Sequence, residues 1–481
     1  MKKKFFFLSF AVLAIMLFAL FFVLSDSRPF FDEGIYLTSG WLFSNGVPPY
    51  SGFFESKPIG IYSVGALLFS VFPATVFTAR IFMALIGILA LALIMLVSNR
   101  VFGEKGAIIS GAFFVFLSLV FGSFWFVIEP FVSLLVLFSV FSYLEFLQKN
   151  SKKWLSVSIL ALAAAVFFKQ TAVLIAVLLS LFFLFNEMRA QKSRLKGLFE
   201  FLPALIPSIL LAAIVFAFLF FTNSFSFFVE YLFLFHASNL GYYGGVILSL
   251  KFLPFLAAVI LPCVLLLAVS AKKIALKKEQ KTLLAILTLW LAGSTAMLLP
   301  LLGCCMHFIP LLPALAILSG FCFVLFWEKG LVCRAFLLAV LFAGVLGGVS
   351  YAFIYSQQQY GFSSIREIAY QVQGLVPENN KILVLQSSPE LYFLSGRMPA
   401  AKALFYSDVQ YPESFIAEEI QLLSRPETKI AVVFSRGGEF TDANPAIDSF
   451  VKQNFVLAEK KQLKFPLYGY YGFALIFEKK Q

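Results

Sequence analysis

The chain has 481 residues, of which 61% are hydrophobic and 13% are charged, and its mean hydropathy is +0.92. This composition excludes an ordinary soluble globular protein. The net charge of +12 does not indicate nucleic-acid binding, because the basic residues lie in short loops between apolar runs. The five cysteines show no CxxC spacing, so the sequence predicts neither a metal cluster nor a disulfide framework.

Apolar runs long enough to cross a hydrocarbon core of about 30 Å recur along the first three quarters of the chain. The first of them resembles a signal peptide, but no small-x-small cleavage site follows it, so we interpret it as a retained span. The sequence predicts eleven membrane spans, at residues 5–24, 77–98, 106–125, 129–147, 154–168, 171–186, 198–221, 246–270, 282–300, 307–327 and 331–354.

The basic residues fix the expected orientation of these spans. They gather in alternate loops, at residues 2–4, 100–105, 149–153, 189–196, 272–281 and 329–334. The positive-inside rule makes these loops cytoplasmic, and with them the amino terminus. An odd number of spans then places the tail outside the cytoplasm, in a multi-pass protein of the cell membrane.

Two apolar segments are too short to span the membrane comfortably. The first, PIGIYSVGALLFSVFP at residues 58–73, lies in a large outer loop, residues 25–76, and predicts a helix on the outer membrane surface. The second is Asn223–Gly245, which links two later spans. We expect both on the outer face.

The tail changes character near Ser356, where polar residues return. Strand-like runs at residues 381–386, 429–435 and 471–478 are separated by helical stretches that include residues 364–375 and 443–455. The fold class predicted is an α-helical polytopic membrane protein with a small extracytoplasmic α/β domain. The predicted domains are residues 1–355 and residues 356–481.

An acidic pair, Asp32 and Glu33, follows the first span in the stretch FFDEGIYLTSG. Two carboxylates near a lipid interface suit a general-base step or a metal, and they also suit the start of a helix. The outer loop further holds Lys57, in FFESKPIG, at a height that suits a phosphate. The structural alternative for Lys57 is an ammonium group that reaches the lipid headgroups.

Three more polar positions interrupt apolar sequence at the predicted outer edge. Glu129 lies in FWFVIEPFV, where an acid is costly unless it is used or paired, for example with Arg80 or Lys169. Lys169 and Gln170, in FFKQTA, occupy a tight turn that needs polarity but not a lysine. His307, in CCMHFIPLLP, opens a late span, and its alternative role is simply to face water at the interface.

The order of these motifs resembles one known group of enzymes. The chain has FDEGIY, then PPY at Pro48–Tyr50, then KP, EP and KQ, and finally HF-x-P-x-x-P. It is similar in this respect to the GT-C fold glycosyltransferases that use polyprenyl-phosphate sugars, which include protein mannosyltransferases and the lipid A aminoarabinose transferase. The segment Ser387–Arg397 also resembles the outer domain of prokaryotic members.

The resemblance implies roles for individual residues. Asp32 would be the general base that deprotonates an acceptor hydroxyl as it attacks the anomeric carbon with inversion, and Glu33 would orient the site. Lys57 would bind the donor phosphate, with Lys169 second and Arg80 beside them. The resemblance assigns the sugar and acceptor contacts to these side chains: Glu129, Gln170, His307, Tyr36 and Glu55.

The motifs also depart from the family pattern. Ile59 follows the KP pair where the family often has a second proline, and Phe308 stands where a tyrosine is common. Some relatives use a divalent metal beside the acidic loop and others do not, and the sequence does not decide between them. The expected partners are a lipid-linked sugar donor, an acceptor that is a protein, a lipid or a glycan, and membrane lipids, with no nucleic acid.

Two alternative functions are also compatible with a protein that has many membrane spans and few charges within them. A transporter or flippase of lipid-linked glycans usually places its polar residues near the bilayer midplane in broken helices. The candidate residues of this chain instead gather at the outer edge. A non-catalytic relative would be expected to have lost the acidic pair, which is intact.

Overall fold

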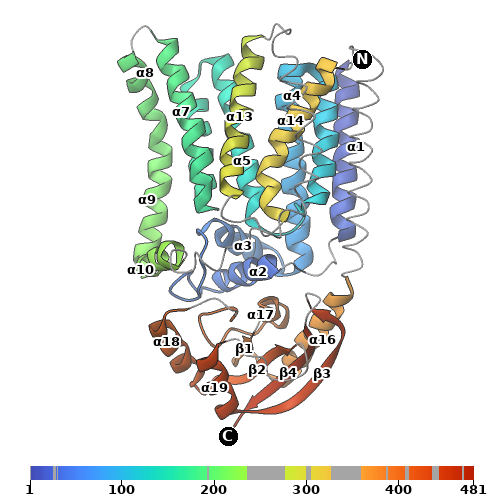
Figure 1. The fold of residues 1–481 in the computed structure, drawn as a ribbon, viewed down its shortest axis with the longest axis vertical. Coiled ribbons are helices and arrows are strands. Elements are labelled where there is room, and N and C mark those ends of the chain that lie inside the picture. The colour runs from blue at the N-terminus through green and yellow to red at the C-terminus, as the bar shows by residue number, and fades with distance from the viewer. Residues whose placement is uncertain are drawn as a thin grey trace.

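The computed structural model describes residues 2–24, 29, 31–191, 194–235, 277–298, 305–326, 359–385, 388–406, 411–435, 444–467 and 471–480. The described parts form three layers (Figure 1): a bundle of long helices, two short helices across one end of the bundle, and a sheet domain beyond them. The predicted spans at residues 246–270 and 331–354 lie outside the described residues.

The bundle consists of apolar helices packed side by side. Their outward faces can also be apolar, because these faces contact lipid tails and not water. Six of the described helices are long and apolar enough to cross a membrane. The chain is therefore a multi-pass membrane protein. Its helices are α1 (Lys2–Val23), α4 (Val76–Val120), α5 (Ile128–Lys149), α6 (Lys152–Val166), η2 (Gln170–Ala172), α7 (Val173–Ala190), α8 (Arg194–Phe201), η3 (Leu202–Leu205), α9 (Ile206–Phe221), α13 (Lys278–Leu298), η6 (Cys305–Leu311) and α14 (Leu312–Phe326).

Helix α4 is two helices that meet at Gly103, whose φ of 79° lies in the left-handed region. Such a backbone suits glycine, which carries no Cβ, and it breaks the regular helical pattern. The kink falls between the predicted spans 77–98 and 106–125. The turn between these two helices was therefore readable from the sequence.

The outer loop holds two helices, α2 (Phe31–Ser44) and α3 (Gly60–Val71). Helix α3 confirms the short helix predicted within residues 58–73, whereas α2 was not predicted as a helix. The two pack closely, since a Cβ placed on Gly40 would lie 2.8 Å from the Cα of Gly65. Asp32 and Glu33 lie in the first turn of α2, where negative charge is favourable beside the helix dipole.

The second short apolar segment is helical where the structure describes it. Helix α10 (Phe225–Val229) continues into a π-helical turn, η4 (Glu230–Leu234). Residues 236–245 of the predicted segment lie outside the described residues. The segment lies at the same end of the bundle as α2 and α3 (Figure 1).

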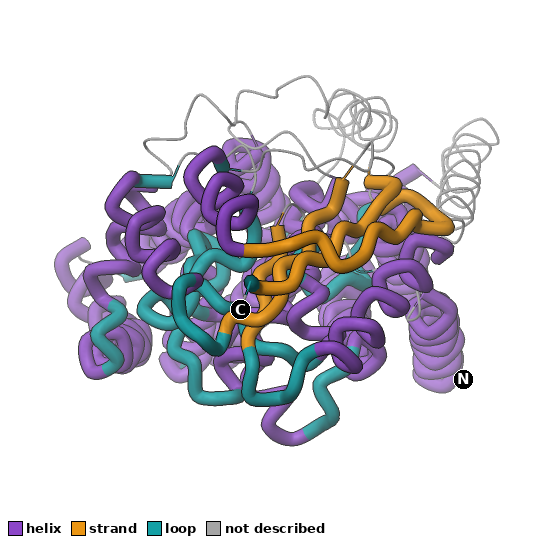
Figure 2. Tube along the Cα trace, turned by 90° about the horizontal axis from the view of Figure 1, so that it is seen from below, coloured by secondary structure: helices purple, strands orange, loops and turns teal. Residues whose placement is uncertain are grey.

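The sheet domain contains a four-stranded sheet in the order β1-β2-β4-β3. Strands β1 and β2 pair in parallel, and β4 runs antiparallel to both β2 and β3. Seen from below (Figure 2), the strands lie across the end of the helix bundle. The elements are α16 (Gln359–Leu375), β1 (Lys381–Leu385), α17 (Glu390–Ser395), α18 (Glu413–Leu423), β2 (Thr428–Ser435), α19 (Pro445–Asn454), β3 (Phe455–Leu467) and β4 (Tyr471–Lys479).

Strands β1, β2 and β4 and helices α16 and α19 confirm the predicted elements of the tail, but β3 was missed. The sequence of β3 contains Glu459, Lys460 and Lys461 in succession, which hides the alternation of a strand. It pairs only with β4, at the edge of the sheet, where charged side chains are tolerated and discourage association with other strands.

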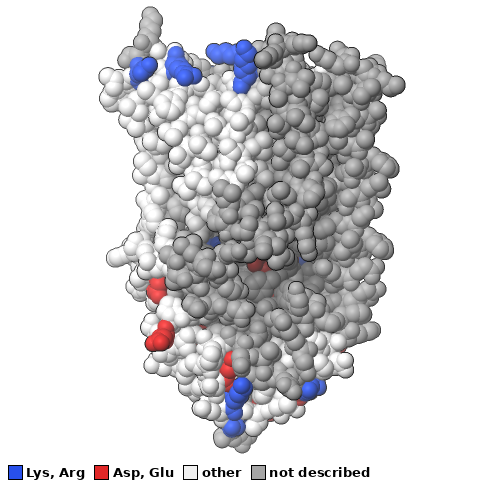
Figure 3. Space-filling view, in the orientation of Figure 1, with Lys and Arg blue, Asp and Glu red and all other residues white. Residues whose placement is uncertain are grey.

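Charge is distributed unevenly along the molecule. On the face shown in Figure 3, lysine and arginine side chains gather at the end of the bundle opposite the sheet domain, and the described residues just below them form a broad area without charges. Among the pairs at that end, Arg100 contacts Glu145 at 2.9 Å and Lys152 contacts Glu187 at 3.0 Å.

Candidate active site

Helix α2 directs its two adjacent carboxylates to different surroundings. Successive residues of an α-helix point about 100° apart, so Asp32 is partly exposed while Glu33 is fully buried. Burial raises the pKa of the Asp32 carboxyl, and so does the nearby Glu129 carboxylate, while the electrostatic influence of His307, Lys57 and Lys169 partly offsets this effect. Asp32, the carboxylate that the sequence predicts to be reactive, is therefore largely removed from water but still partly accessible.

Glu33 is held by Arg80 in a fully buried ion pair. The guanidinium donates from Nε to Oε1 at 2.6 Å and from Nη2 to Oε2 at 2.5 Å, and its Nη1 donates to the carbonyl of Leu24 at 2.7 Å. The backbone N–H of Phe126 also donates to Glu33, at 2.9 Å. These bonds tie α2 to the end of α1, the start of α4 and the loop before α5.

This geometry corrects the phosphate role expected of Arg80. Its guanidinium is already bonded to a carboxylate and a carbonyl, and its side chain is buried. A phosphate could reach it only if the ion pair opened, which would leave Glu33 as an uncompensated buried charge. We therefore assign Arg80 to holding Glu33, and with it the first turn of α2.

Glu33→Gln is expected to lower the free energy of unfolding by about 3–5 kcal/mol, because it leaves the Arg80 charge buried without a counter-charge. Thermal melting of the detergent-purified protein measures this loss. Lys196→Met is the control, since Lys196 contacts Glu200 at 4.0 Å on an exposed surface and such pairs contribute less than about 1 kcal/mol. Equal melting temperatures for Glu33→Gln and the control would contradict the structural role.

A second polar cluster joins Glu129, Lys169 and His307, which come from three different segments. The ammonium group of Lys169 donates to Glu129 Oε1 at 2.7 Å, and Nδ1 of His307 lies 3.1 Å from the same oxygen. Lys169 and His307 are 3.3 Å apart. Glu129 is therefore paired, as the structural alternative in the sequence analysis expected. Its partners are Lys169 and His307, and not Arg80.

Lys57 lies on the loop between α2 and α3, and two tyrosines fix its backbone. The hydroxyls of Tyr50 and Tyr62 donate to the Lys57 carbonyl at 2.8 and 3.3 Å. Tyr50 itself has a φ of 69°, a conformation that non-glycine residues rarely adopt. The sequence analysis names Tyr50 only as part of the PPY motif and does not predict that Tyr62 contacts Lys57. The one available signal was that Tyr62 follows the candidate lysine by five residues.

The Lys57 ammonium forms no hydrogen bond or ion pair with the residues that the structure describes. Its pKa is lowered by burial, while the carboxyls of Glu55 and Asp32 act in the opposite sense. Burial in turn raises the pKa of Glu55 to about 7, although its Oε1 accepts the N–H of Ser56 at 2.7 Å. Lys57 is thus a cation close to carboxylates and free to take an additional anion.

Gln170 and Tyr36 complete the set of predicted residues. Among the described residues, the Gln170 side-chain oxygen is buried without a hydrogen-bond partner, which is unusual for a buried polar atom and fits a bound hydroxyl. Tyr36 is buried on α2, and its ring centroid lies 6.4 Å from that of Tyr62. Gln170 follows Lys169 of the Glu129 cluster in the chain, and Tyr36 reaches the Lys57 loop through Tyr62.

A metal does not fit the residues that the structure describes. Within the described ranges, no three side chains among His, Cys, Asp and Glu come together closely enough to hold an ion. Two of the site's carboxylates are instead engaged by cationic side chains, Glu33 by Arg80 and Glu129 by Lys169.

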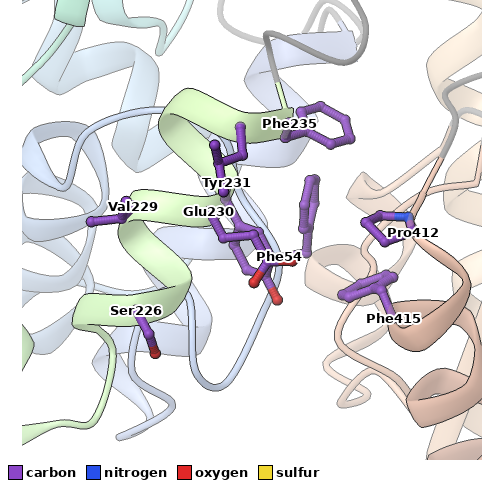
Figure 4. Close-up of a pocket in the computed structure, with 9 residues that line it drawn as sticks. Phe54, Ser226, Val229, Glu230, Tyr231, Phe235, Pro412 and Phe415 are labelled. Atoms are coloured by element: carbon purple, nitrogen blue, oxygen red, sulfur yellow. The ribbon is translucent and has the colours of Figure 1, made fainter.

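An aromatic cavity of about 440 Å³ adjoins the Lys57 loop (Figure 4). Phe54 lies between the two walls of this cavity, with Tyr231 of η4 on one side and Phe415 of α18 on the other. The cavity is thus built jointly by the outer loop, by α10 and η4, and by the sheet domain. Its lining consists of Phe54, Ser226, Val229, Glu230, Tyr231, Leu234, Phe235, Pro412 and Phe415.

Comparison with known proteins gives one sequence match and several structural ones. Residues 56–216 match the family described as dolichyl-phosphate-mannose-protein mannosyltransferase. This segment runs from Ser56 through Lys57, Arg80 and Glu129 to Lys169 and beyond, so it contains much of the candidate site. No curated protein matches the chain in sequence.

The solved structures cover almost the whole chain. ArnT from Cupriavidus metallidurans, bound to undecaprenyl phosphate, is similar over 99% of this chain and 98% of its own, with 15% identity and a TM-score of 0.60. The Archaeoglobus fulgidus oligosaccharyltransferase in complex with zinc and sulfate is similar over 97% of this chain and 72% of its own, with 12% identity and a TM-score of 0.58. Almost the whole chain therefore has the GT-C fold of these two membrane proteins, and residues 56–216 match the mannosyltransferase family.

Proposed function

We propose that this enzyme transfers a sugar from a polyprenyl-phosphate carrier to an acceptor hydroxyl on the outer face of the cell membrane. The observation that carries the proposal is the position of Asp32, a desolvated carboxylate within electrostatic reach of Lys57 and of the Glu129, Lys169 and His307 cluster. A carboxylate that can act as a base thus lies close to the cationic side chain of Lys57.

The distribution of charge supports an outer-face site. Lysines and arginines gather at the bundle end opposite the sheet domain (Figure 3), which the positive-inside rule assigns to the cytoplasm together with the amino terminus. Helices α2 and α3 and the sheet domain then lie outside (Figure 1). An acceptor arriving from outside would meet Asp32 without crossing the bilayer.

The reaction follows from the groups on α2 and the Lys57 loop. The acceptor oxygen attacks the anomeric carbon as the bond from that carbon to the phosphate oxygen breaks, which inverts the configuration. The hydroxyl proton passes to the Asp32 carboxylate, which acts as general base. The polyprenyl phosphate departs with the electron pair and one additional negative charge.

Lys57 and, beside it, Lys169 are proposed to stabilise this departing charge. Cationic donors fixed in a water-poor site act strongly on charge that develops in the transition state. The similar ArnT structure binds undecaprenyl phosphate, and an archaeal oligosaccharyltransferase of similar fold binds dolichol-phosphate, which supports a lipid phosphate as the leaving group. Glu129, Gln170, His307, Tyr36 and Glu55 remain the proposed contacts to sugar and acceptor.

The direct test incubates the purified protein with labelled sugars carried on undecaprenyl or dolichyl phosphate. Separate arms offer protein, lipid and glycan acceptors. We expect label to move from the carrier to one acceptor class, with release of polyprenyl phosphate and inversion at the anomeric carbon.

The same protein in liposomes distinguishes the transporter alternative. Movement of a lipid-linked glycan between leaflets, with no transfer to any acceptor, would replace the proposal by a flippase function. The position of the polar residues at one end of the bundle favours transfer, since transporters usually bind their substrate near the bilayer midplane.

A further inference from the structure

The sheet domain contacts helix α2 two residues after Asp32. Gly34 of α2 faces Glu390, the first residue of α17, which is fully buried. A Cβ placed on Gly34 would lie 2.8 Å from Oε2, 3.2 Å from Cβ and 3.3 Å from the backbone nitrogen of Glu390. A side chain at Gly34 would therefore displace the Glu390 carboxylate and press against the start of α17, so the two helices approach closely at this point.

The contact continues along one face of α2. Residues three and four apart share a helix face, and Thr38 follows Gly34 by four positions. Its buried hydroxyl donates to the carbonyl of Pro389 at 2.9 Å. Trp41, three positions further on, packs edge to face with Phe393 of α17, with ring centroids 6.5 Å apart.

A different contact of α2 joins it to α3, the other helix of the outer loop. Gly40 meets Gly65 of α3 at backbone distance, and Gly65 in turn faces the ring of Phe126. Phe69 of α3 also reaches α17, with its ring centroid 5.4 Å from that of Phe393. Helix α2 is thus clamped between α3 and α17, so its position depends on the sheet domain as well as on the bundle.

We infer that α17 of the sheet domain is a positioning element for Asp32, so that the sheet domain takes part in holding the catalytic base. This inference rests on the proposed function. Asp32 lies in the first turn of α2, two residues before Gly34 and less than two turns before Thr38, so a shift of the helix moves its carboxylate directly. Displacement of a catalytic group by about 1 Å can cost on the order of 100-fold in rate.

A double-mutant cycle tests the contact. Gly34→Ala is expected to lower kcat at least tenfold while the KM for the lipid donor stays within about twofold. Glu390→Ala removes the nearest atom, so Gly34→Ala should cost much less in that background. Gly374→Ala is the control, because a Cβ at this glycine of the same domain meets nothing within 4 Å.

Two outcomes of the cycle would overturn the inference. One is an equal effect of Gly34→Ala in both backgrounds, which would show that the Glu390 contact is not the cause. The other is a raised KM for the acceptor with unchanged kcat, which would assign the α17 contact to acceptor binding.

Thr38→Val provides a second variant that keeps the shape of the side chain and loses only the bond to Pro389. We expect the same fall in kcat with an unchanged donor KM and normal protein yield. A readout independent of transfer is the modification rate of Asp32→Cys by a membrane-impermeant maleimide, in a background with the five native cysteines replaced. An unaltered rate after Thr38→Val would overturn the positioning role, whereas absence of transfer by the wild type would overturn the proposed function alone.

Discussion

Asp32→Asn is expected to reduce the rate of sugar transfer by about 100- to 10,000-fold, the contribution typical of a general base. The amide keeps the size of the side chain but cannot accept the proton of the acceptor hydroxyl. Its neighbours Glu33 and Arg80 remain paired, so the fold should persist. Initial rates with a saturating labelled donor measure the change.

The control for this substitution is Glu413→Gln, an exposed carboxylate at the start of α18. It should transfer sugar at the wild-type rate. Transfer by Asp32→Asn at that same rate, with unchanged melting, would exclude Asp32 as the base.

The pH dependence gives a second check on the same carboxyl. Burial raises the pKa of Asp32 above its ordinary value of 3.8. The base form is lost as the pH falls through the raised pKa, so the rate should decline on the acid side at a higher pH than an exposed aspartate would give. This acid limb should be missing from the residual activity of Asp32→Asn.

Much of the candidate site was readable from the sequence because its residues are conspicuous. Glu129, Lys169 and His307 are polar positions in apolar surroundings, and a polar group in such a place must be paired or used. The topology derived from the basic loops put them at one end of the bundle. Their mutual distances, between 2.7 and 3.3 Å, come only from the structure.

The role of Arg80 could not be read in the same way. It stands at the head of a span, and nothing local shows that its partner is Glu33, 47 positions earlier. The two acids of the pair look alike in sequence. Only the rotation of α2 against α4 and α5 decides that Glu33 points inward and Asp32 does not.

Helix α2 was not predicted from the sequence for a similar physical reason. Helix α2 contains Gly34 and Gly40, which weaken a helix by roughly 1 kcal/mol each compared with alanine, so local propensity does not favour it. Both glycines are required by close packing, one against Glu390 and the other against Gly65. Tertiary contacts therefore stabilise α2, and a single sequence does not show them.

Lys57→Met is expected to lower the transfer rate by about 100- to 1,000-fold, the effect typical of removing one donor that stabilises developing charge. Methionine retains most of the aliphatic stem and removes the ammonium group. Lys57→Arg should recover part of the loss, because it restores the charge with a different geometry. Binding of undecaprenyl phosphate to the purified variants should weaken in the same order.

Lys57 is expected to contribute more than Lys169 to stabilising the departing phosphate, because the two lysines differ in the bonds that they already make. Lys169 donates to Glu129 and lies against His307, whereas the Lys57 ammonium has no such partner among the described residues. Burial lowers the pKa of Lys57, so the rate should also decline as rising pH removes its proton. Lys429→Met, at an exposed lysine of β2, is the control. If Lys57→Met binds undecaprenyl phosphate and transfers sugar as that control does, the phosphate must instead meet Lys169, and the Glu129 pair would have to open to admit it.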